Sequence, residues 1–302
     1  MNKKINKGPL QVFLGSALWG TDAVFRTQLT KAFSSMHIVF YEHIFGALFS
    51  LPLLIKNSKL FRKMNSLDWL SLLYIALGGG VLGTFFITQS FRYAFQFGNI
   101  NVPILIQKVQ PFIAIIAAFI LLRERIKPLY WLYAFIAIIG GYILSFGFGI
   151  VEFSLANHDL VVAMYALGAA FFWGTCTVVG KRLVDRLGFK FTTAIRLSAG
   201  LLLLILIMAF TDMFSSVGLL NLKYLLFFAY IGLITGFLSL FIYYIGMMKT
   251  KAHVATIAEL GMPLSAVFFN WLLLGETLAF NHIIGGLMVI GAVVMMGVMD
   301  SK

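Results

Sequence analysis

Long apolar stretches alternate with short polar breaks along the whole chain of 302 residues. The stretches run for about 20 residues without the two-residue alternation of a strand, and this is the length that a helix needs to cross a bilayer core. Charged residues, proline, asparagine or glycine mark the breaks. The pattern predicts ten membrane-spanning helices, near residues 10–30, 36–55, 67–91, 101–122, 129–148, 160–181, 190–211, 223–247, 252–274 and 280–299.

The composition agrees with this pattern and excludes several classes of protein. Hydrophobic residues make up 61% of the chain and charged residues 11%, with a mean hydropathy of +0.95, whereas a soluble domain carries about 25% charged residues. A soluble enzyme, a disordered protein and a disulfide scaffold are therefore excluded, and the continuous apolar stretches exclude a transmembrane β-barrel. The sequence contains one cysteine and no phosphate loop, metal-ligand spacing or nucleophile elbow. We therefore expect no enzymatic activity, no metal and no cofactor.

Lysine and arginine gather on one side of the predicted bundle. Of 23 such residues, 17 lie at the two termini and in the loops of that side, 3 lie in the loops of the other side and 3 lie within spans. Because positive residues favour cytoplasmic loops, we expect an inner-membrane protein with both termini in the cytoplasm. The net charge of +12 then reports topology, and we expect no nucleic-acid partner. The lysines before Gly8 precede no small-residue cleavage signature, which predicts a retained first span.

The two halves of the chain share short motifs in the same order, 152 to 154 residues apart. The matched motifs are Trp19-Gly20-Thr21 with Trp173-Gly174-Thr175, Pro111 with Pro263, and Leu122-Arg123-Glu124 with Leu274-Gly275-Glu276. Five predicted helices per half is an odd number, so the second half crosses the membrane in the opposite direction. We therefore predict an all-α integral membrane protein with two inverted five-helix repeats, residues 1–150 and 151–302, in one membrane domain. Inverted repeats are typical of carriers that work by alternating access, and a duplication that only stabilises a bundle is the alternative.

These halves, the Trp-Gly-Thr sequences and the Leu-x-Glu helix ends resemble the EamA-type family of the drug/metabolite transporter superfamily, over about residues 10 to 299. The resemblance implies a carrier whose first helix faces a central cavity, and it favours export across a bacterial inner membrane. It leaves the substrate open, because the family moves amino acids, sugars, nucleotide sugars, quaternary amines and drugs. Glu42 stands where the family pattern has a positive residue, whereas Arg196 matches that pattern in the second half.

Charged residues within the predicted spans are the first candidates for function. Each costs about 2.5–3.5 kcal/mol near the bilayer centre, so it should face a cavity or a partner. Asp22 and Arg26 lie four residues apart on one helix face, which allows either a local ion pair or contact of Asp22 with a substrate or a proton. For Glu42 two roles stay open: a structural bond to Arg26 or Lys108, or a functional role in transport. A lone intramembrane histidine such as His43 is more often a satisfied hydrogen-bonding group.

Two helices combine polar residues with an internal proline. They contain Gln107 to Pro111 and Glu259 to Pro263, and Glu259 is the counterpart of Gln107 at an offset of 152. Proline removes a backbone hydrogen bond, and interrupted helices at matching places predict a binding site near the bilayer midplane. The expected substrate-binding or coupling residues are Trp19, Asp22, Glu42, Gln107, Lys108, Gln110, Trp173, Tyr243, Tyr244 and Glu259. The expected gating or charge partners are Arg26, His43, Arg92 and Arg196, of which Arg196 could instead reach the lipid headgroups.

The sequence thus predicts a secondary active or exchange transporter. The mixed charges favour a small polar metabolite, an amino acid-like zwitterion or an organic amine, moved outward, with protons as a candidate coupling ion. The alternatives are an uptake carrier for an organic cation or a nucleoside-type metabolite, and a non-transporting receptor or scaffold. The partners are then the small-molecule substrate and the lipid bilayer. Gly140-Gly141 and Gly285-Gly286 permit close helix contact, so the chain is expected to be a monomer or a homodimer.

Overall fold

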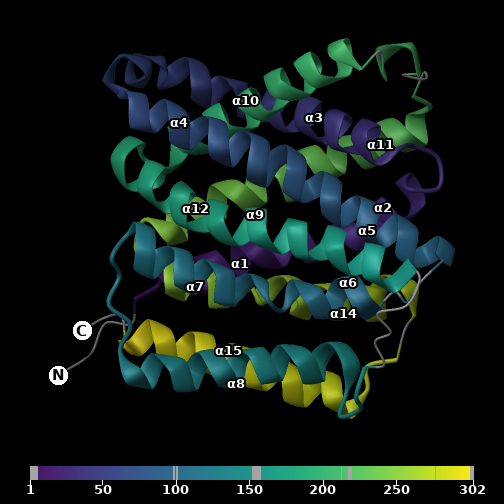
Figure 1. Cartoon of the computed structure of the whole chain (residues 1–302), viewed down its shortest axis with the longest axis vertical. Coiled ribbons are helices and arrows are strands. Elements are labelled where there is room, and N and C mark those ends of the chain that lie inside the picture. Colours follow the sequence, from purple (N-terminus) through teal and green to yellow (C-terminus); the bar gives the residue numbers. More distant parts are fainter. Residues whose placement is uncertain are drawn as a thin grey trace.

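The computed structural model describes residues 6–97, 99, 101–151, 158–211, 213–216, 220–275 and 277–299. Throughout this part of the chain the structure is helical and contains no strand (Figure 1). The predicted all-helical class is therefore confirmed.

Nine helical segments within the described residues are long and apolar enough to cross a membrane, by length and composition. They are α3 (Ser35–Lys56), α4–η2–α5 (Ser66–Tyr74, Ile75–Leu82, Gly83–Phe97), α6–α7 (Asn101–Gln107, Gln110–Leu121), α8 (Pro128–Phe146), α9 (His158–Leu187), α10 (Phe189–Phe210), α11–η4–α12 (Leu222–Tyr230, Ile231–Leu238, Ser239–Met247), α13–α14 (Ala252–Ala258, Gly261–Leu274) and α15 (Phe280–Met299). Two short 3-10 helices, η1 (Ser58–Lys63) and η3 (Met213–Ser216), lie in loops.

The segment expected as the first span is divided into α1 (Gly8–Gly20) and α2 (Asp22–Leu29). The division falls at Thr21, whose backbone N–H donates to the Leu18 carbonyl at 3.2 Å and whose hydroxyl donates to the same oxygen at 2.7 Å. This tight turn ends the regular ladder, so neither piece alone has the length of a span. The sequence pattern did not predict the break.

The breaks expected at the two prolines are present. Lys108 and Val109 separate α6 from α7, and Glu259 and Leu260 separate α13 from α14. Pro111 then lies at the beginning of α7, where a missing N–H leaves no bond unmade. Both polar segments therefore sit at a discontinuity of the backbone ladder.

The segments η2 and η4 are π-helices at corresponding places of the two halves. π-helical turns are rare in proteins, and those that occur are often found at functional sites. η4 packs closely on α3 because it presents Gly232, where an added Cβ would lie 2.9 Å from the Gly46 nitrogen. Hydropathy does not reveal this change of hydrogen-bond register.

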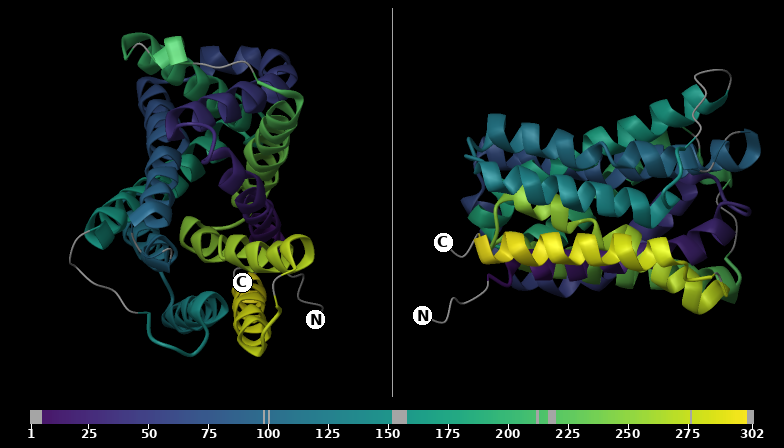
Figure 2. Two further views of the ribbon diagram at one scale, coloured as in Figure 1. Left: turned by 90° about the vertical axis from the view of Figure 1, so that its right-hand side faces the viewer. Right: turned by 90° about the horizontal axis from the view of Figure 1, so that it is seen from below.

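The helices run side by side, with α8 and α15 as a pair at one edge (Figure 1). α15 begins beside the end of α8, where Asn281 Nδ2 donates to the Ile143 carbonyl at 3.2 Å. α1 begins beside the end of α12, where Asn6 Nδ2 donates to the Lys249 carbonyl at 2.6 Å. The start of α1 and the end of α15 thus lie at the same end of the molecule (Figure 2), which we call the terminus side. Its cytoplasmic location stays a prediction.

A buried apolar cluster lies on the terminus side between α1, α12 and α13. We call it the terminus-side seal; its members include Val12, Tyr243, Tyr244, Met247, Ala255 and Ala258. Close backbone approach makes this packing possible, since a Cβ added at Gly15 would lie 2.6 Å from the Tyr243 nitrogen. The first segment of the chain is therefore packed directly against the second half.

Two acidic residues join helix ends on the terminus side. Asp68, with a fully buried side chain at the start of α4, pairs with Arg182 at 3.2 Å and Arg186 at 2.9 Å from the end of α9. Glu124, after α7, accepts hydrogen bonds at the start of α13 from the backbone of Ala252 at 2.9 Å and of His253 at 3.2 Å, and contacts His253 Nδ1 at 2.5 Å. Burial alone would raise the pKa of Glu124, but these hydrogen bonds outweigh it and lower the pKa.

Glu124 thus explains the glutamate of the first Leu-x-Glu motif, which caps a helix of the other half. Its counterpart Glu276 lies outside the described residues.

Candidate functional site

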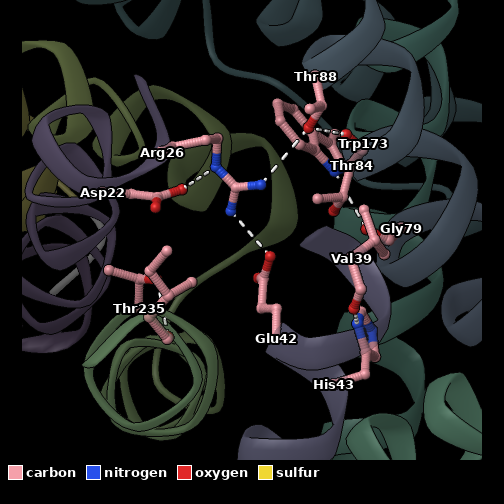
Figure 3. A network of polar contacts seen from close by, with 11 residues as sticks. Asp22, Arg26, Val39, Glu42, His43, Gly79, Thr84, Thr88, Trp173 and Thr235 are labelled. Carbon is pink, nitrogen blue, oxygen red and sulfur yellow. Dashed lines mark hydrogen bonds and ion pairs between the residues drawn. The ribbon is translucent and has the colours of Figure 1, made fainter. Parts of the chain in front are cut away.

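Arg26 joins three helices through one guanidinium group (Figure 3). Its Nε bonds the carboxylate of Asp22 on α2, and its Nη2 donates to Glu42 Oε2 on α3 at 2.8 Å. Its Nη1 donates to the Thr88 hydroxyl on α5 at 3.4 Å. The side chains of Arg26, Asp22 and Glu42 are only 14%, 17% and 15% exposed. We call these three residues the charged triad.

The charged triad carries two carboxylates and one cation. Asp22 Oδ1 is buried and accepts no hydrogen bond from the described residues. The triad therefore keeps an acceptor for a further donor. Of the two partners that the sequence allowed for Glu42, the structure selects Arg26.

Trp173 on α9 contacts η2 and the beginning of α5. Its Nε1 donates to the Gly79 carbonyl of η2 at 3.1 Å, and it packs against Gly83, where an added Cβ would lie 2.6 Å from Nε1. Thr84 follows Gly83 and accepts the Thr88 hydroxyl at 2.7 Å through its carbonyl (Figure 3). A partly exposed indole thus stands beside the polar groups of α5.

A second polar cluster surrounds Glu259 at the break between α13 and α14. Glu259 Oε2 accepts from Gln110 Nε2 of α7 at 2.6 Å. Its Oε1 accepts from the Tyr243 hydroxyl of α12 at 2.6 Å and contacts the Thr177 hydroxyl of α9 at 3.0 Å. The ring of Trp19 packs on Tyr243 with centroids 5.2 Å apart. We call Glu259, Gln110, Thr177 and Tyr243 the glutamate cluster.

The glutamate cluster contains three residues expected from the sequence, Gln110, Tyr243 and Glu259, and one that was missed. Trp19, which was also expected, packs on the cluster through Tyr243, and these four expected residues come from four segments. Thr177 was not a candidate, because a threonine in an apolar helix is common. Its position four residues after Trp173, on the same helix face, was the available signal.

Arg196 reaches inward from α10. Its Nη1 donates to the Tyr244 hydroxyl at 2.8 Å, and its Nη2 lies 2.6 Å from the place of a Cβ added at Gly79. The guanidinium therefore contacts protein groups, and the expected alternative of reaching lipid headgroups is wrong for this conformation.

Comparison with known proteins decides the family. The sequence model of the EamA-like transporter family matches residues 6–146 and again residues 160–298. The chain belongs to the EamA-like transporter family. It is 33% identical over 295 residues to the riboflavin transporter ImpX of Fusobacterium nucleatum subsp. nucleatum, covering 95% of this chain and 96% of that protein. It is 25% identical over 285 residues to an uncharacterized transporter of Clostridium kluyveri, covering 93% and 90%.

A solved crystal structure has the same fold as this chain, with a TM-score of 0.72 over 96% of both chains at 16% identity. The family and the apolar helices together identify a multi-pass membrane protein that transports a small molecule.

The other predicted residues of this EamA-like chain occupy different surroundings. His43 Nδ1 contacts the Val39 carbonyl at 2.9 Å, and its ring fits between Gly80 and Gly200, so it is the satisfied buried histidine that was expected as the alternative. Lys108 Nζ lies beside Gly141 of α8, at 3.8 Å from an added Cβ. Of the predicted charged and amide residues outside both clusters, Arg92, Gln107 and Lys108 make no side-chain hydrogen bond or ion pair with described residues.

Metal chemistry finds no support in the described part of the chain. No group of three histidine, cysteine, aspartate or glutamate side chains there could hold a metal ion.

Proposed function

We propose that this chain carries riboflavin, or a neutral metabolite that likewise joins a planar heterocycle to a polyhydroxylated chain, by alternating access across the membrane. The support for the solute is the name of the relative with 33% identity over nearly the whole chain. The support for the site is the charged triad together with Thr88 and Trp173, which offers hydrogen-bonding groups beside an indole ring.

The architecture behind this proposal is ten spans in two inverted halves, residues 1–150 and 151–302. The family model matches the chain twice, in two consecutive stretches. Helix breaks and π-helices recur at corresponding places. We assign α1 and α2 together to one further span, the first in the chain, in addition to the nine above. Each half then has five spans, and the two halves have opposite orientations in the membrane.

Charge balance favours a neutral solute. The intramembrane groups comprise three acidic and three basic residues: Asp22, Glu42, Glu259, Arg26, Lys108 and Arg196. Arg26 already bonds both carboxylates of the charged triad, so an amine would have to compete with it. A neutral solute pays no such penalty. It can donate to the unused Asp22 Oδ1 and place its ring against Trp173, an arrangement worth about 0.5–1.5 kcal/mol beyond area burial for aromatic pairs.

We place the access to this site on the side opposite the termini. The terminus-side seal contains Tyr243, Tyr244 and Val12, which are at most 3% exposed. The charged triad keeps 14–17% exposure. With cytoplasmic termini this conformation faces outward, and alternating access requires the seal to open in the other state.

Riboflavin counterflow tests the proposal. Purified protein in liposomes loaded with riboflavin should take up labelled riboflavin, and external riboflavin should compete. An amino acid, an organic amine and a nucleoside should not compete, and competition by one of them alone would transfer the assignment to that class, as the sequence-based prediction has it. The family resemblance predicts export. Measuring whether cells that produce the protein release or accumulate riboflavin tests this direction.

A matched pair of tryptophan variants locates the site. Trp173→Ala should weaken riboflavin binding about tenfold, since stacking on an aromatic side chain contributes about 1–3 kcal/mol per base. Trp131→Ala is the control, because Trp131 on α8 is 47% exposed on the outer surface and should leave binding unchanged. Equal effects of the two changes would remove Trp173 from the site.

A further inference from the structure

The carboxylates of the charged triad and of the glutamate cluster have different partners. Asp22 and Glu42 both bond a guanidinium group. Glu259 receives hydrogen bonds only from an amide, a phenol and a threonine hydroxyl, and forms no ion pair with a described residue. A carboxylate without a cation inside a membrane is expensive when charged, and a proton is the smallest ligand that removes the charge.

The hydrogen-bond geometry accommodates both protonation states of Glu259. In the charged state Gln110, Tyr243 and Thr177 all donate to the carboxylate. In the neutral state Glu259 Oε1–H can donate to Thr177 Oγ1 over the same 3.0 Å. Thr177 then turns its own hydrogen to the Trp173 carbonyl, 3.1 Å from its oxygen. Neither state leaves a buried donor unpaired.

The charged triad differs from the glutamate cluster because it contains a bonded cation. Arg26 holds each of the two carboxylates through one oxygen, in a site whose side chains are at most 17% exposed. Both carboxylates of the triad thus have an opposite charge within hydrogen-bonding distance, whereas Glu259 is bonded by neutral donors, and this difference favours Glu259 as the proton site.

The helices around α13 bring few charges to Glu259. Among the residues that the structure describes, Tyr243 of α12 is the one titratable group in contact with Glu259. Arg196 of α10 donates to the Tyr244 hydroxyl, and its positive charge also acts on Glu259 without bonding it. Lys108, before α7, points to α8. The other neighbours of this region are Trp19 of α1, Thr177 of α9 and apolar side chains of α15. At the far end of α13, His253 contacts Glu124, and its carbonyl accepts the hydroxyl of Tyr130 of α8.

The glutamate cluster adjoins the terminus-side seal and is separate from the substrate groups. Tyr243 belongs to both the cluster and the seal. None of the hydrogen-bond partners of Glu259 is a residue of the charged triad or Thr88. A proton at Glu259 and a solute at Trp173 can therefore be present together.

We infer that Glu259 is the site of a coupling proton that travels in the same direction as the substrate, and this inference rests on the proposed carrier function. The proton neutralises Glu259, weakens its hold on Gln110 and Tyr243, and thereby releases the contact between α7 and α12 beside the seal. Symport with protons drives uptake into the cell, which opposes the export direction predicted from the sequence.

A proton gradient across liposomes tests the inference with the wild-type protein. An inward gradient of one pH unit should accumulate riboflavin about tenfold at one proton per substrate, because a tenfold ratio equals about 1.4 kcal/mol. A protonophore should abolish the accumulation. Glu259→Gln should abolish it as well and flatten the pH profile of counterflow. Asp185→Asn, a carboxylate that is 48% exposed and paired with Lys181, should keep the wild-type accumulation.

The outcomes separate the inference from the function on which it rests. Wild-type counterflow without a response to the gradient overturns proton coupling and leaves riboflavin transport standing. Absent counterflow overturns the proposed solute, and infrared spectroscopy then decides the proton site without any substrate. A protonated-carboxyl band that titrates in wild type and is lost in Glu259→Gln supports the site, whereas an unchanged band in that variant overturns it. Thr177→Val should shift the midpoint of this titration because it removes the acceptor of the neutral state.

Discussion

Replacing Arg26 with glutamine removes the cation that two carboxylates share. Arg26 bonds Asp22 through Nε and Glu42 through Nη2, and the three side chains are at most 17% exposed. Removing one partner of a buried pair costs about 3–5 kcal/mol, because the remaining charge is uncompensated. We therefore expect Arg26→Gln to lower the free energy of unfolding by about 3–4 kcal/mol, in the lower half of that range because some solvent reaches the groups.

A second substitution should recover part of this loss. In the Arg26→Gln background, Glu42→Gln removes one of the two uncompensated carboxylates, so the double variant should be more stable than the sum of the single effects predicts. Residues that share an ion-pair network couple by about 0.5–3 kcal/mol, and the 2.8 Å contact places this pair in the upper half of the range.

Equilibrium unfolding in mixed detergent micelles measures the cycle from the wild type, the two single variants and the double variant. Lys181 and Asp185 provide the control cycle, because they lie 2.6 Å apart but Asp185 is 48% exposed. Exposed pairs of this kind couple by less than about 1 kcal/mol. A coupling energy at Arg26 and Glu42 no larger than the control would refute the reasoning, since Arg26 would then not compensate Glu42 in the folded protein.

Two further predictions concern the terminus side. Asp68→Asn should lower the free energy of unfolding by about 2–4 kcal/mol in the same titration, because two partly exposed arginines lose their fully buried counter-ion; a change below half a kcal/mol would show that the arginines are satisfied by solvent. For Glu124 the lowered pKa means that its stabilising contribution is complete above its ordinary value of 4.5 and is lost as the pH falls through the lower value of the folded protein. The free energy of unfolding, measured across this acid range, should depend less on pH in Glu124→Gln than in wild type. The same dependence on pH in both proteins would contradict the role of Glu124 as a helix cap.

Hydropathy was sufficient to predict where the membrane-spanning segments lie along the chain. Nine predicted spans agree with helical segments, because about 20 apolar residues in a membrane have no other way to pair their backbone groups. The break at Thr21 and the wide turns of η2 and η4 were not predictable in this way. Each changes which carbonyl a backbone N–H meets, and the average apolarity of the segment stays the same.

The site could be predicted by residue type better than by partner. Intramembrane charge singled out Arg26, Glu42 and Glu259, since such groups need compensation wherever they lie. The partners Thr88 and Thr177 were missed because a hydroxyl in a helix costs little and leaves no mark on the pattern. Lys108 was expected at the site, but its side chain points to α8, and that direction depends on the rotation of the α6–α7 segment against its neighbours.

The unbroken helix α9 has a consequence for how this carrier can evolve. Its Trp173 carries the indole of the proposed substrate site, while the carbonyl of the same residue lies 3.1 Å from the Thr177 hydroxyl in the glutamate cluster. A substitution that changes the backbone of α9 around Trp173 to admit a new solute also moves the Trp173 carbonyl oxygen, which the Thr177 hydroxyl of the glutamate cluster contacts. Changes of specificity are therefore tolerated more easily on α5, around Thr88, than on α9. Descendants of this protein should diversify their solutes through α5 while α9 stays nearly constant.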